Sequence, residues 1–210
     1  MASFSQKLCF VSGFICALIK TFVSLNQSKS GKMKKLFIIT AFLTAFISSA
    51  FTISLLWKAD EKNSTVNFEL PGDGKKGTFS NLTASINFDS KNLASSKISA
   101  AIDVKTIKAG NEKLEAHLLS ADFFDAEKFP KITFTSTEIK TAETGFVAKG
   151  TLNIKDSTKI IDLPFTFSDA QDKGTFTGTM TILAGDYGVM KKSKGGNDKV
   201  IVTLVVPVTK

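Results

Sequence analysis

From Trp57 to the C-terminus, apolar and polar residues alternate along most of the chain, which is the pattern of β-strands with one buried face. Clusters of Gly, Asp, Asn and Pro separate the alternating runs, and these residues favour turns. The pattern predicts about eight strands, at residues 66–70, 82–88, 98–104, 146–154, 161–167, 176–182 and 200–208, with a further one that begins at 132–134. Phe79 is offset by one residue from the 82–88 run, as at a bulge.

One segment has the spacing of a helix instead. Leu114, His117 and Leu118 follow one another at i, i+3 and i+4, which places them on one helical face. Asn111 is a suitable N-cap residue, and Glu112 suits the first turn of a helix. The sequence predicts a single short helix from about Asn111 to Leu119 that stops before Pro130.

Antiparallel strands of this number must hide their two outer edges, and closure into a barrel hides them most completely. A sandwich of two sheets is the alternative. Pro164 lies within the sixth run, and because proline cannot donate to the ladder it predicts a sheet edge or a bulge there.

Small residues occupy several apolar strand positions, namely Ala84, Ala100, Ala148, Gly150 and Gly178. In a filled barrel they would accommodate bulky neighbours, whereas in a ligand-binding barrel they would keep room for an apolar guest. Both interpretations remain open, and the phenylalanine-rich composition slightly favours a large apolar interior.

The charge of the chain is unevenly distributed. The formal net charge is +8, but six of the 27 lysines lie within residues 1–50, which contain no acidic residue. The other 21 lysines nearly balance the 19 acidic residues, and the chain contains no arginine. Because arginine provides the bidentate recognition of guanine and phosphate, we expect no binding to nucleic acid.

Residues 33–50 have the order of a secretory signal peptide. Lys34-Lys35 precede an uncharged apolar run at 36–47, and Ser48-Ser49-Ala50 follow as small residues before a cleavage site. We therefore predict cleavage after Ala50, location in the periplasm or outside the cell, and Met33 as the true start.

An uncleaved anchor is the alternative, because residues 36–56 carry no charge over 21 residues, a length that can span a bilayer. Cys9 and Cys16 lie upstream of the predicted cleavage site. The exported chain would therefore contain no cysteine and would fold without disulfides.

The candidate chemistry is sparse. His117 is the single histidine and no cysteine follows it, so neither a metal site nor a nucleophile–base pair has its usual side chains. His117 either packs on the helix face with a hydrogen bond to the barrel rim or contacts the head group of a ligand. We expect Asp122 and Asp125 to end the helical segment while Phe123-Phe124 enter the core. The sequence thus predicts no catalytic and no metal-binding residue.

A lysine-rich segment at 191–194 precedes Gly195-Gly196. A phosphate-binding loop would need a helix after it, but a strand pattern follows, so we expect a solvated hairpin tip. Lys191 and Lys192 remain candidates for a weak contact with an anionic head group at the barrel mouth.

Several short blocks of this chain form a recognisable series. In order, they are Trp57-x-x-Asp60, Ser64-x-Val66-x-Phe68, Gly77-x-Phe79, Ile86-x-Phe88-Asp89, His117-Leu118-x-Ser120-x-Asp122-Phe123-Phe124-Asp125, Phe129-Pro130-x-Ile132-x-Phe134-x-Ser136, Gly150-x-Leu152-x-Ile154 and Asp186-Tyr187-Gly188. The most specific are the block that begins at His117 and the block that begins at Phe129. With these blocks the chain resembles the YceI-like family of polyisoprenoid-binding periplasmic proteins.

The resemblance implies an all-β, lipocalin-like antiparallel barrel over residues 51–210, with residues 1–50 as an N-terminal extension and signal peptide. It also implies a long apolar channel that holds an amphiphile with an isoprenoid tail. Together with the alternation, it assigns the channel lining to Phe68, Phe79, Phe88, Ala100, Ile102, Phe134, Gly150, Leu152, Phe165 and Phe176.

The chain departs from the family pattern at three places. Asn63-Ser64 stands where the family often has His-Ser, Gly110-Asn111-Glu112 lacks the usual Arg or Asn before Asp, and residues 184–188 lack an Arg or Lys before Asp. If those basic residues hold head groups in the family, the head-group preference differs here.

The leading hypothesis is an exported, non-enzymatic protein that binds an isoprenoid or similar long-chain lipid for transport, storage or sequestration, with a quinone-like ligand included and no catalytic cofactor. The alternatives are a structural or stress-related envelope protein with a filled barrel and an enzyme that acts on a lipid-like substrate. Membrane contact would be transient or made through an uncleaved N-terminal segment, and a homodimer remains open.

The signal-peptide interpretation predicts a defined N-terminus. The intact mass of the protein recovered from the periplasm should correspond to a chain that starts near Phe51. A recovered chain that still contains Leu36 would contradict cleavage and would support the anchor.

Overall fold

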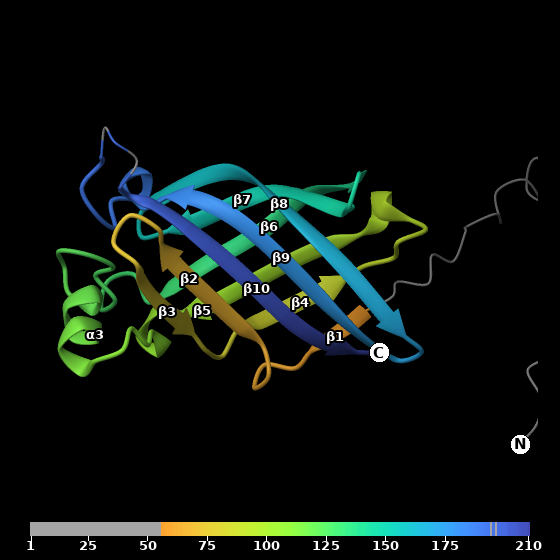
Figure 1. Cartoon of the computed structure of the whole chain (residues 1–210). Coiled ribbons are helices and arrows are strands. Elements are labelled where there is room, and N and C mark those ends of the chain that lie inside the picture. The colour runs from red at the N-terminus through yellow and green to blue at the C-terminus, as the bar shows by residue number, and fades with distance from the viewer. Residues whose placement is uncertain (1–55, 194, 196) are drawn as a thin grey trace, which may run out of the picture. The chain divides into compact units, whose positions relative to one another are not determined.

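Ten strands form one antiparallel sheet in the computed structural model, which describes residues 56–193, 195 and 197–210 (Figure 1). The strands are β1 (Leu56–Ala59), β2 (Thr65–Leu70), β3 (Lys75–Phe79), β4 (Thr83–Asn87), β5 (Lys97–Asp103), β6 (Lys131–Ala142), β7 (Gly145–Ile154), β8 (Ser157–Ala170), β9 (Lys173–Leu183) and β10 (Lys199–Thr209). The predicted signal segment, its cleavage site, Cys9 and Cys16 lie outside the described residues.

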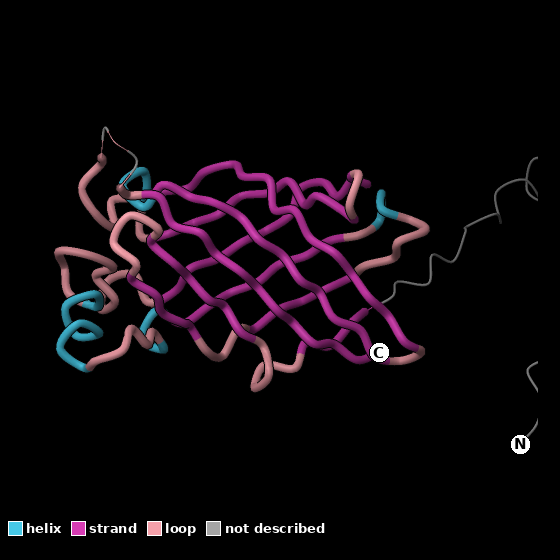
Figure 2. Tube along the Cα trace, viewed as in Figure 1, coloured by secondary structure: helices cyan, strands magenta, loops and turns pink. Residues whose placement is uncertain are grey.

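The sheet closes on itself through β10, the last strand. β10 pairs with β9 along its whole length, and on its other side it pairs with β2 near its start and with β1 near its end. β1 and β2 are two parts of one strand course, as are β3 and β4, so eight courses surround the interior (Figure 2). The predicted closed antiparallel barrel is confirmed, and the two-sheet sandwich is excluded.

The turn between β1 and β2 keeps this closure continuous. The Asp60 backbone N–H donates to the carbonyl of Pro207 at 2.8 Å, between the pairs that β10 makes with β1 and β2. Ser64 donates to the Asp60 carbonyl through its backbone N–H at 2.9 Å and its hydroxyl at 2.7 Å. The Asn63 side chain donates to the Asp60 carboxylate at 2.7 Å and lowers the pKa of that carboxyl group.

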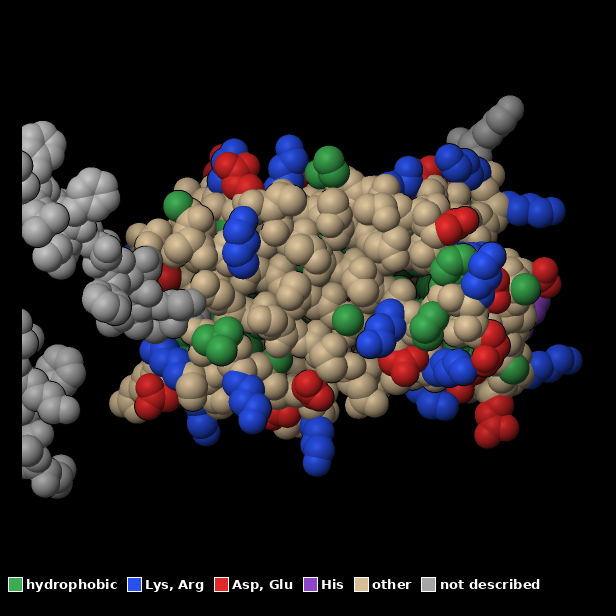
Figure 3. Space-filling model, turned by 180° about the vertical axis from the view of Figure 1, so that it is seen from behind, with side chains coloured by type: hydrophobic (Ala, Val, Ile, Leu, Met, Phe, Trp, Pro, Cys, Tyr) green, Lys and Arg blue, Asp and Glu red, His purple; other side chains and the backbone are tan. Residues whose placement is uncertain are grey.

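The sides of the barrel follow the polar–apolar alternation of the strands. Inward positions carry the aliphatic and aromatic core, and outward positions carry mostly Lys, Asp, Glu and Thr. Figure 3 shows charged side chains spread over one outer face, with hydrophobic side chains scattered between them. No helix among the described residues has the length and apolar character needed to cross a bilayer.

Pro164 marks an irregularity in the wall. β8 pairs with β7 from Ser157 to Phe165, and Pro164 lies opposite Val147 in that ladder. The ladder between β8 and β9 begins only at Phe165, opposite Gly178, and continues to Ala170. The sheet edge predicted from Pro164 is therefore present on one side of β8 only.

An aromatic cluster fills the end of the barrel where β1 lies. Phe88 stands at its centre, with ring centroids 5.0–5.6 Å from four other phenylalanine rings. The Trp57 indole N–H donates to the Phe88 carbonyl at 3.0 Å. We call this set the aromatic plug: Trp57, Phe88, Phe146, Phe165, Phe167 and Phe176.

The single α-helix of the described residues, α3 (Glu112–Leu119), lies at the opposite end of the barrel (Figure 1). The Asn111 side chain accepts a hydrogen bond from the Leu114 backbone N–H at 2.8 Å, as expected of an N-cap. The helix ends at Ser120, whose N–H and hydroxyl both bond to the His117 carbonyl. The predicted helix is confirmed, but Ser120 ends it in place of Asp122 and Asp125.

The aromatic plug predicts a strong dependence of stability on Phe88, which is 1% exposed. Phe88→Ala should lower the free energy of unfolding by about 3–5 kcal/mol, because the remaining rings cannot close the space it leaves. Urea denaturation measures this difference. The control Leu56→Ala, at a side chain that is 63% exposed, should change it by less than about 0.5 kcal/mol. Equal effects of the two substitutions would contradict the plug.

Candidate ligand-binding site

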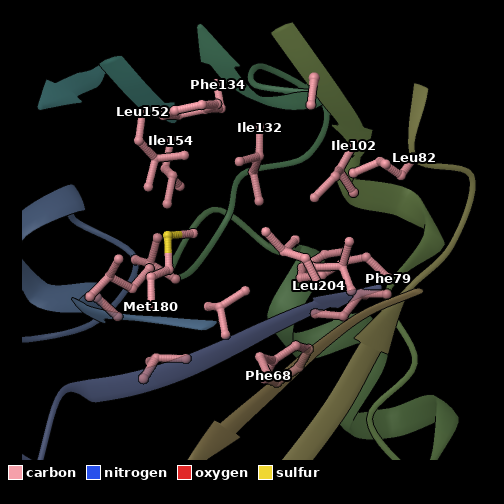
Figure 4. Close-up of a pocket in the computed structure, with 18 of the residues that line it drawn as sticks. Phe68, Phe79, Leu82, Ile102, Ile132, Phe134, Leu152, Ile154, Met180 and Leu204 are labelled. Atoms are coloured by element: carbon pink, nitrogen blue, oxygen red, sulfur yellow. The ribbon is translucent and has the colours of Figure 1, made fainter. Parts of the chain in front are cut away.

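The barrel encloses an apolar cavity of about 360 Å³ between the aromatic plug and α3. Side chains from strands all around the barrel point into it, as the close-up in Figure 4 shows for Phe68, Ile132, Leu152, Met180 and Leu204. Apart from a few residues at the α3 end, the lining is aliphatic or aromatic. The interior is therefore open rather than filled, which decides between the two interpretations that the sequence left open.

Most of the predicted channel residues lie in this lining. Phe68, Phe79, Ala100, Ile102, Phe134, Leu152, Phe165 and Phe176 all line the cavity. Phe88 and Gly150 do not. Contact of any of these residues with a ligand stays a prediction.

Phe88 lies below the cavity because it belongs to the aromatic plug. Phe165 and Phe176 separate it from the open space, since both rings contact Phe88 and also line the cavity. Phe88 therefore supports the floor of the cavity and is not part of the cavity lining. The alternation identified its inward direction but not its height along the barrel axis.

Gly150 lies in the barrel wall behind the ring of Phe134, which covers it on the cavity side. A Cβ atom at this position would lie 2.8 Å from the Phe134 ring and 2.4 Å from the Thr135 carbonyl oxygen. The Phe134 ring thus lies against the wall because Gly150 has no side chain, and the cavity keeps its width. A larger residue here would be overpacked, at a cost of about 1–3 kcal/mol, whether or not a ligand is bound.

The same arrangement occurs beside β3. The Phe68 ring occupies the space where a Cβ atom of Gly77, its cross-strand partner, would be 2.3 Å away. Phe68 and Phe134 therefore both line the cavity as rings whose outer atoms cover a glycine.

The helix α3 and the segment after it cover part of the cavity mouth. Leu114, His117 and Leu118, the predicted helical face, all line the cavity. The His117 ring packs edge-on against Phe123, with centroids 4.6 Å apart, and Phe124 packs against Phe79 at 5.9 Å. The described structure gives the His117 side chain this aromatic contact, not the hydrogen bond to the rim that the sequence predicted.

The charged part of the rim comes from the β2–β3 turn, which the sequence analysis did not single out. Asp73, Lys75 and Lys76 line the mouth, and the ammonium group of Lys75 lies 3.3 Å from the Asp73 carboxylate. Lys76 pairs with Glu69 at 3.2 Å. The turn Pro71-Gly72-Asp73-Gly74 was visible in the sequence, but only the folded barrel brings its residues and those of α3 to the lining of one cavity.

The lysines proposed from the sequence lie elsewhere. Lys192 is not part of the cavity lining, and its ammonium group pairs with the Asp186 carboxylate at 2.9 Å. This contact lowers the pKa of Asp186. Lys191 is exposed and also lies outside the lining. A head-group contact by these two lysines stays a prediction.

Two polar side chains fix the segments around the mouth. Glu115 on α3 accepts hydrogen bonds from the Lys108 ammonium group at 2.9 Å and the Ala109 backbone N–H at 3.0 Å, which lower its pKa. Lys155, in the β7–β8 turn, donates to the carbonyls of Phe123 at 2.6 Å and Gly188 at 3.2 Å. Lys155 thus connects three segments that are far apart in the sequence.

The described residues include no cluster of three or more His, Cys, Asp or Glu side chains that could hold a metal ion. What the site offers is a large apolar surface that is removed from water, with polar groups at one end only. Such an arrangement binds amphiphiles with the apolar part inside.

Comparison with known sequences places the barrel in a family. The YceI-like domain model matches residues 57–208. This range contains all ten strands apart from the first residue of β1 and the last residue of β10. Protein YceI of Escherichia coli is 29% identical over 136 residues, which cover 62% of this chain and 71% of that protein. A Yersinia enterocolitica protein is 34% identical over 87 residues, or 41% of this chain and 45% of that protein.

Solved structures show the same fold. The YceI protein of Campylobacter jejuni is 25% identical, with a TM-score of 0.57 over 64% of this chain and 84% of its own. BcnA of Burkholderia cenocepacia has a TM-score of 0.68 at 23% identity, over 72% of this chain and 100% of its own. A polyisoprenoid binding domain from Saccharophagus degradans has a TM-score of 0.55 at 16% identity, over 73% of this chain and 97% of its own. Since the family model matches most of the chain, the protein belongs to the YceI-like family.

Proposed function

We propose that the protein is an exported, non-enzymatic binding protein that holds an isoprenoid or similar long-chain amphiphile in the barrel for transport, storage or sequestration. The observation that carries this proposal is the apolar cavity of about 360 Å³, closed at one end by the aromatic plug and polar only at the α3 end. An apolar tail fits such a cavity, while a polar head group would remain at the rim.

The size and lining of the cavity support a lipid ligand. Small-molecule sites commonly have volumes of about 300–1,000 Å³ and are mostly apolar. Burial of about 400 Å² of tail surface would contribute roughly 10 kcal/mol at about 25 cal/mol per Å², before the cost of ordering the chain. An exposed ion pair at the rim contributes at most about 1 kcal/mol. The tail would therefore set the affinity and the rim the orientation.

Two further observations support the proposal. A structural neighbour from Saccharophagus degradans is described as a polyisoprenoid binding domain, and it shares the fold of this chain. The order of Lys34-Lys35, an apolar run and Ser48-Ser49-Ala50 supports export to the periplasm.

Identification of a bound lipid tests the proposal directly. An organic extract of the natively purified protein, analysed by mass spectrometry, should contain an isoprenoid lipid in near-stoichiometric amount. Protein that carries no lipid and also fails to retain added geranylgeraniol would contradict lipid binding. Chemical conversion of the added lipid would favour an enzyme instead.

Ala100 provides a sharper test of where the tail lies. Ala100 lines the cavity, whereas the next residue, Ala101, is outside the lining. Ala100→Phe should remove about 100 Å² of buried tail surface, which at about 25 cal/mol per Å² costs roughly 2–3 kcal/mol of binding free energy. The dissociation constant for geranylgeraniol should therefore rise by roughly 30- to 150-fold.

The matched control is Ala101→Phe, which adds the same ring on the opposite face of β5. Its dissociation constant should stay within about threefold of the unsubstituted protein, because side chains of neighbouring strand residues point to opposite faces. Equal binding by both variants would place the tail outside this cavity.

A further inference from the structure

The wall of the barrel is interrupted between β8 and β9. Their ladder ends at Phe165 opposite Gly178, although β8 continues back to Ser157 and β9 continues forward to Leu183. Along this stretch β8 pairs with β7, and β9 pairs with β10. We call the stretch between residues 157–164 and 179–183 the β8–β9 seam.

The seam lies directly over the apolar cavity. Leu163 on one side of it and Met180 and Ile182 on the other side all line the cavity. Methionine has an unbranched, flexible side chain that adapts to different neighbours. Movement of a few side chains at the seam would therefore connect the cavity with the outside of the barrel.

The outer face of the seam carries two exposed aliphatic side chains among polar neighbours. Ile160 is 71% exposed and Leu183 is 44% exposed, and they are two of the three exposed large hydrophobic residues that the described part of the chain contains. Continuation of the β8–β9 register would place Ile160 opposite Leu183. Both lie at outward positions, because the neighbouring Ile161 and Ile182 pack against the core.

One lysine flanks this apolar pair on the outer face, because Lys199 is the cross-strand partner of Leu183. Lys159 precedes Ile160 and therefore lies at an inward position near the start of β8. The Lys159 ammonium group lies 4.0 Å from the Asp186 carboxylate and 5.9 Å from the centre of the Tyr187 ring, so it crosses from β8 to the segment after β9. These contacts are partly exposed, and exposed ion pairs of this kind are weak. They hold the seam less firmly than a ladder of backbone hydrogen bonds would.

We infer that the β8–β9 seam is a lateral entrance through which a lipid tail passes from an anionic lipid surface into the cavity. This inference rests on the proposed lipid-binding function. Ile160 and Leu183 enter the lipid surface, and Lys199, the cross-strand partner of Leu183, attracts anionic head groups to it. The tail then moves sideways between β8 and β9, so that it never crosses water or the charged rim beside α3.

Lipid transfer from vesicles tests this route. The probe is radiolabelled geranylgeraniol in phosphatidylcholine vesicles that contain a minor share of phosphatidylglycerol, and the full chain is separated from the vesicles by sedimentation. Ile160→Ser combined with Leu183→Ser should slow the transfer by roughly tenfold, because two aliphatic side chains no longer leave water at the vesicle surface. Leu56→Ser, at an exposed leucine on β1, should leave the rate unchanged.

A reversible lock tests the opening itself. In a Cys9→Ser/Cys16→Ser background, Asp162→Cys with Thr181→Cys places one cysteine on each side of the seam. The oxidised variant should transfer lipid roughly tenfold more slowly than its reduced form. The reason is that the disulfide lowers the population of the state in which β8 and β9 are separated. The control is Thr166→Cys with Thr177→Cys, a pair in the intact ladder, which should not affect the rate.

The outcomes separate this inference from the proposed function. Unchanged transfer by the serine variant, or by a lock whose disulfide is confirmed by mass, would overturn the lateral entrance. If the disulfide does not form, the transfer rate of the Ile160→Ser/Leu183→Ser variant tests the lateral entrance by itself. Retention of geranylgeraniol supplied from detergent should be normal in every variant. Failure of the unsubstituted protein to retain it would contradict lipid binding instead.

Discussion

Closure of the barrel through β10 is the constraint on which the other features depend. β10 pairs with β9 over eleven residues and divides its other edge between β1 and β2. The Asp60 N–H, bonded to the Pro207 carbonyl, continues the closure across the turn between those two strands. A wall without a free edge at this position lets the sheet surround an apolar space, which an open sheet could not keep from water.

The positions of the aromatic rings explain why the barrel is filled at one end and contains a cavity toward the other. At the β1 end, four phenylalanine rings pack around Phe88, and together these rings fill the cross-section of the barrel. Farther along, Phe68 and Phe134 lie over Gly77 and Gly150, so that these rings cover the wall and leave the centre open. The same residue type therefore fills the barrel at one height and shapes a cavity at another.

The two boundaries of the cavity differ in how firmly they are held. At the mouth, Lys155 and Glu115 tie several loops together through hydrogen bonds to the backbone. At the β8–β9 seam, the ladder stops beside Pro164, and Lys159 reaches from β8 to Asp186 in the segment after β9. Opening requires the loss of fewer hydrogen bonds at the seam than at the mouth, which favours movement of the wall over movement of α3.

The amino-acid sequence by itself determined the local structure of this protein. Alternation placed the strands, Asn111 capped the helix at the predicted residue, and the short motifs from Trp57 to Gly188 led to the YceI-like family. Each of these features depends on neighbours within a few residues, so a linear pattern records it.

Tertiary structure alone decided the interior. Alternation showed that Phe88 and Phe134 point inward, but only their heights along the barrel axis made one a part of the plug and the other a wall of the cavity. Likewise, Lys75 and Lys76 form part of the rim because folding brings them to the same cavity as α3, while Lys192 pairs with Asp186. Strand tilt and register set these positions, and both arise from pairing between segments far apart in the chain.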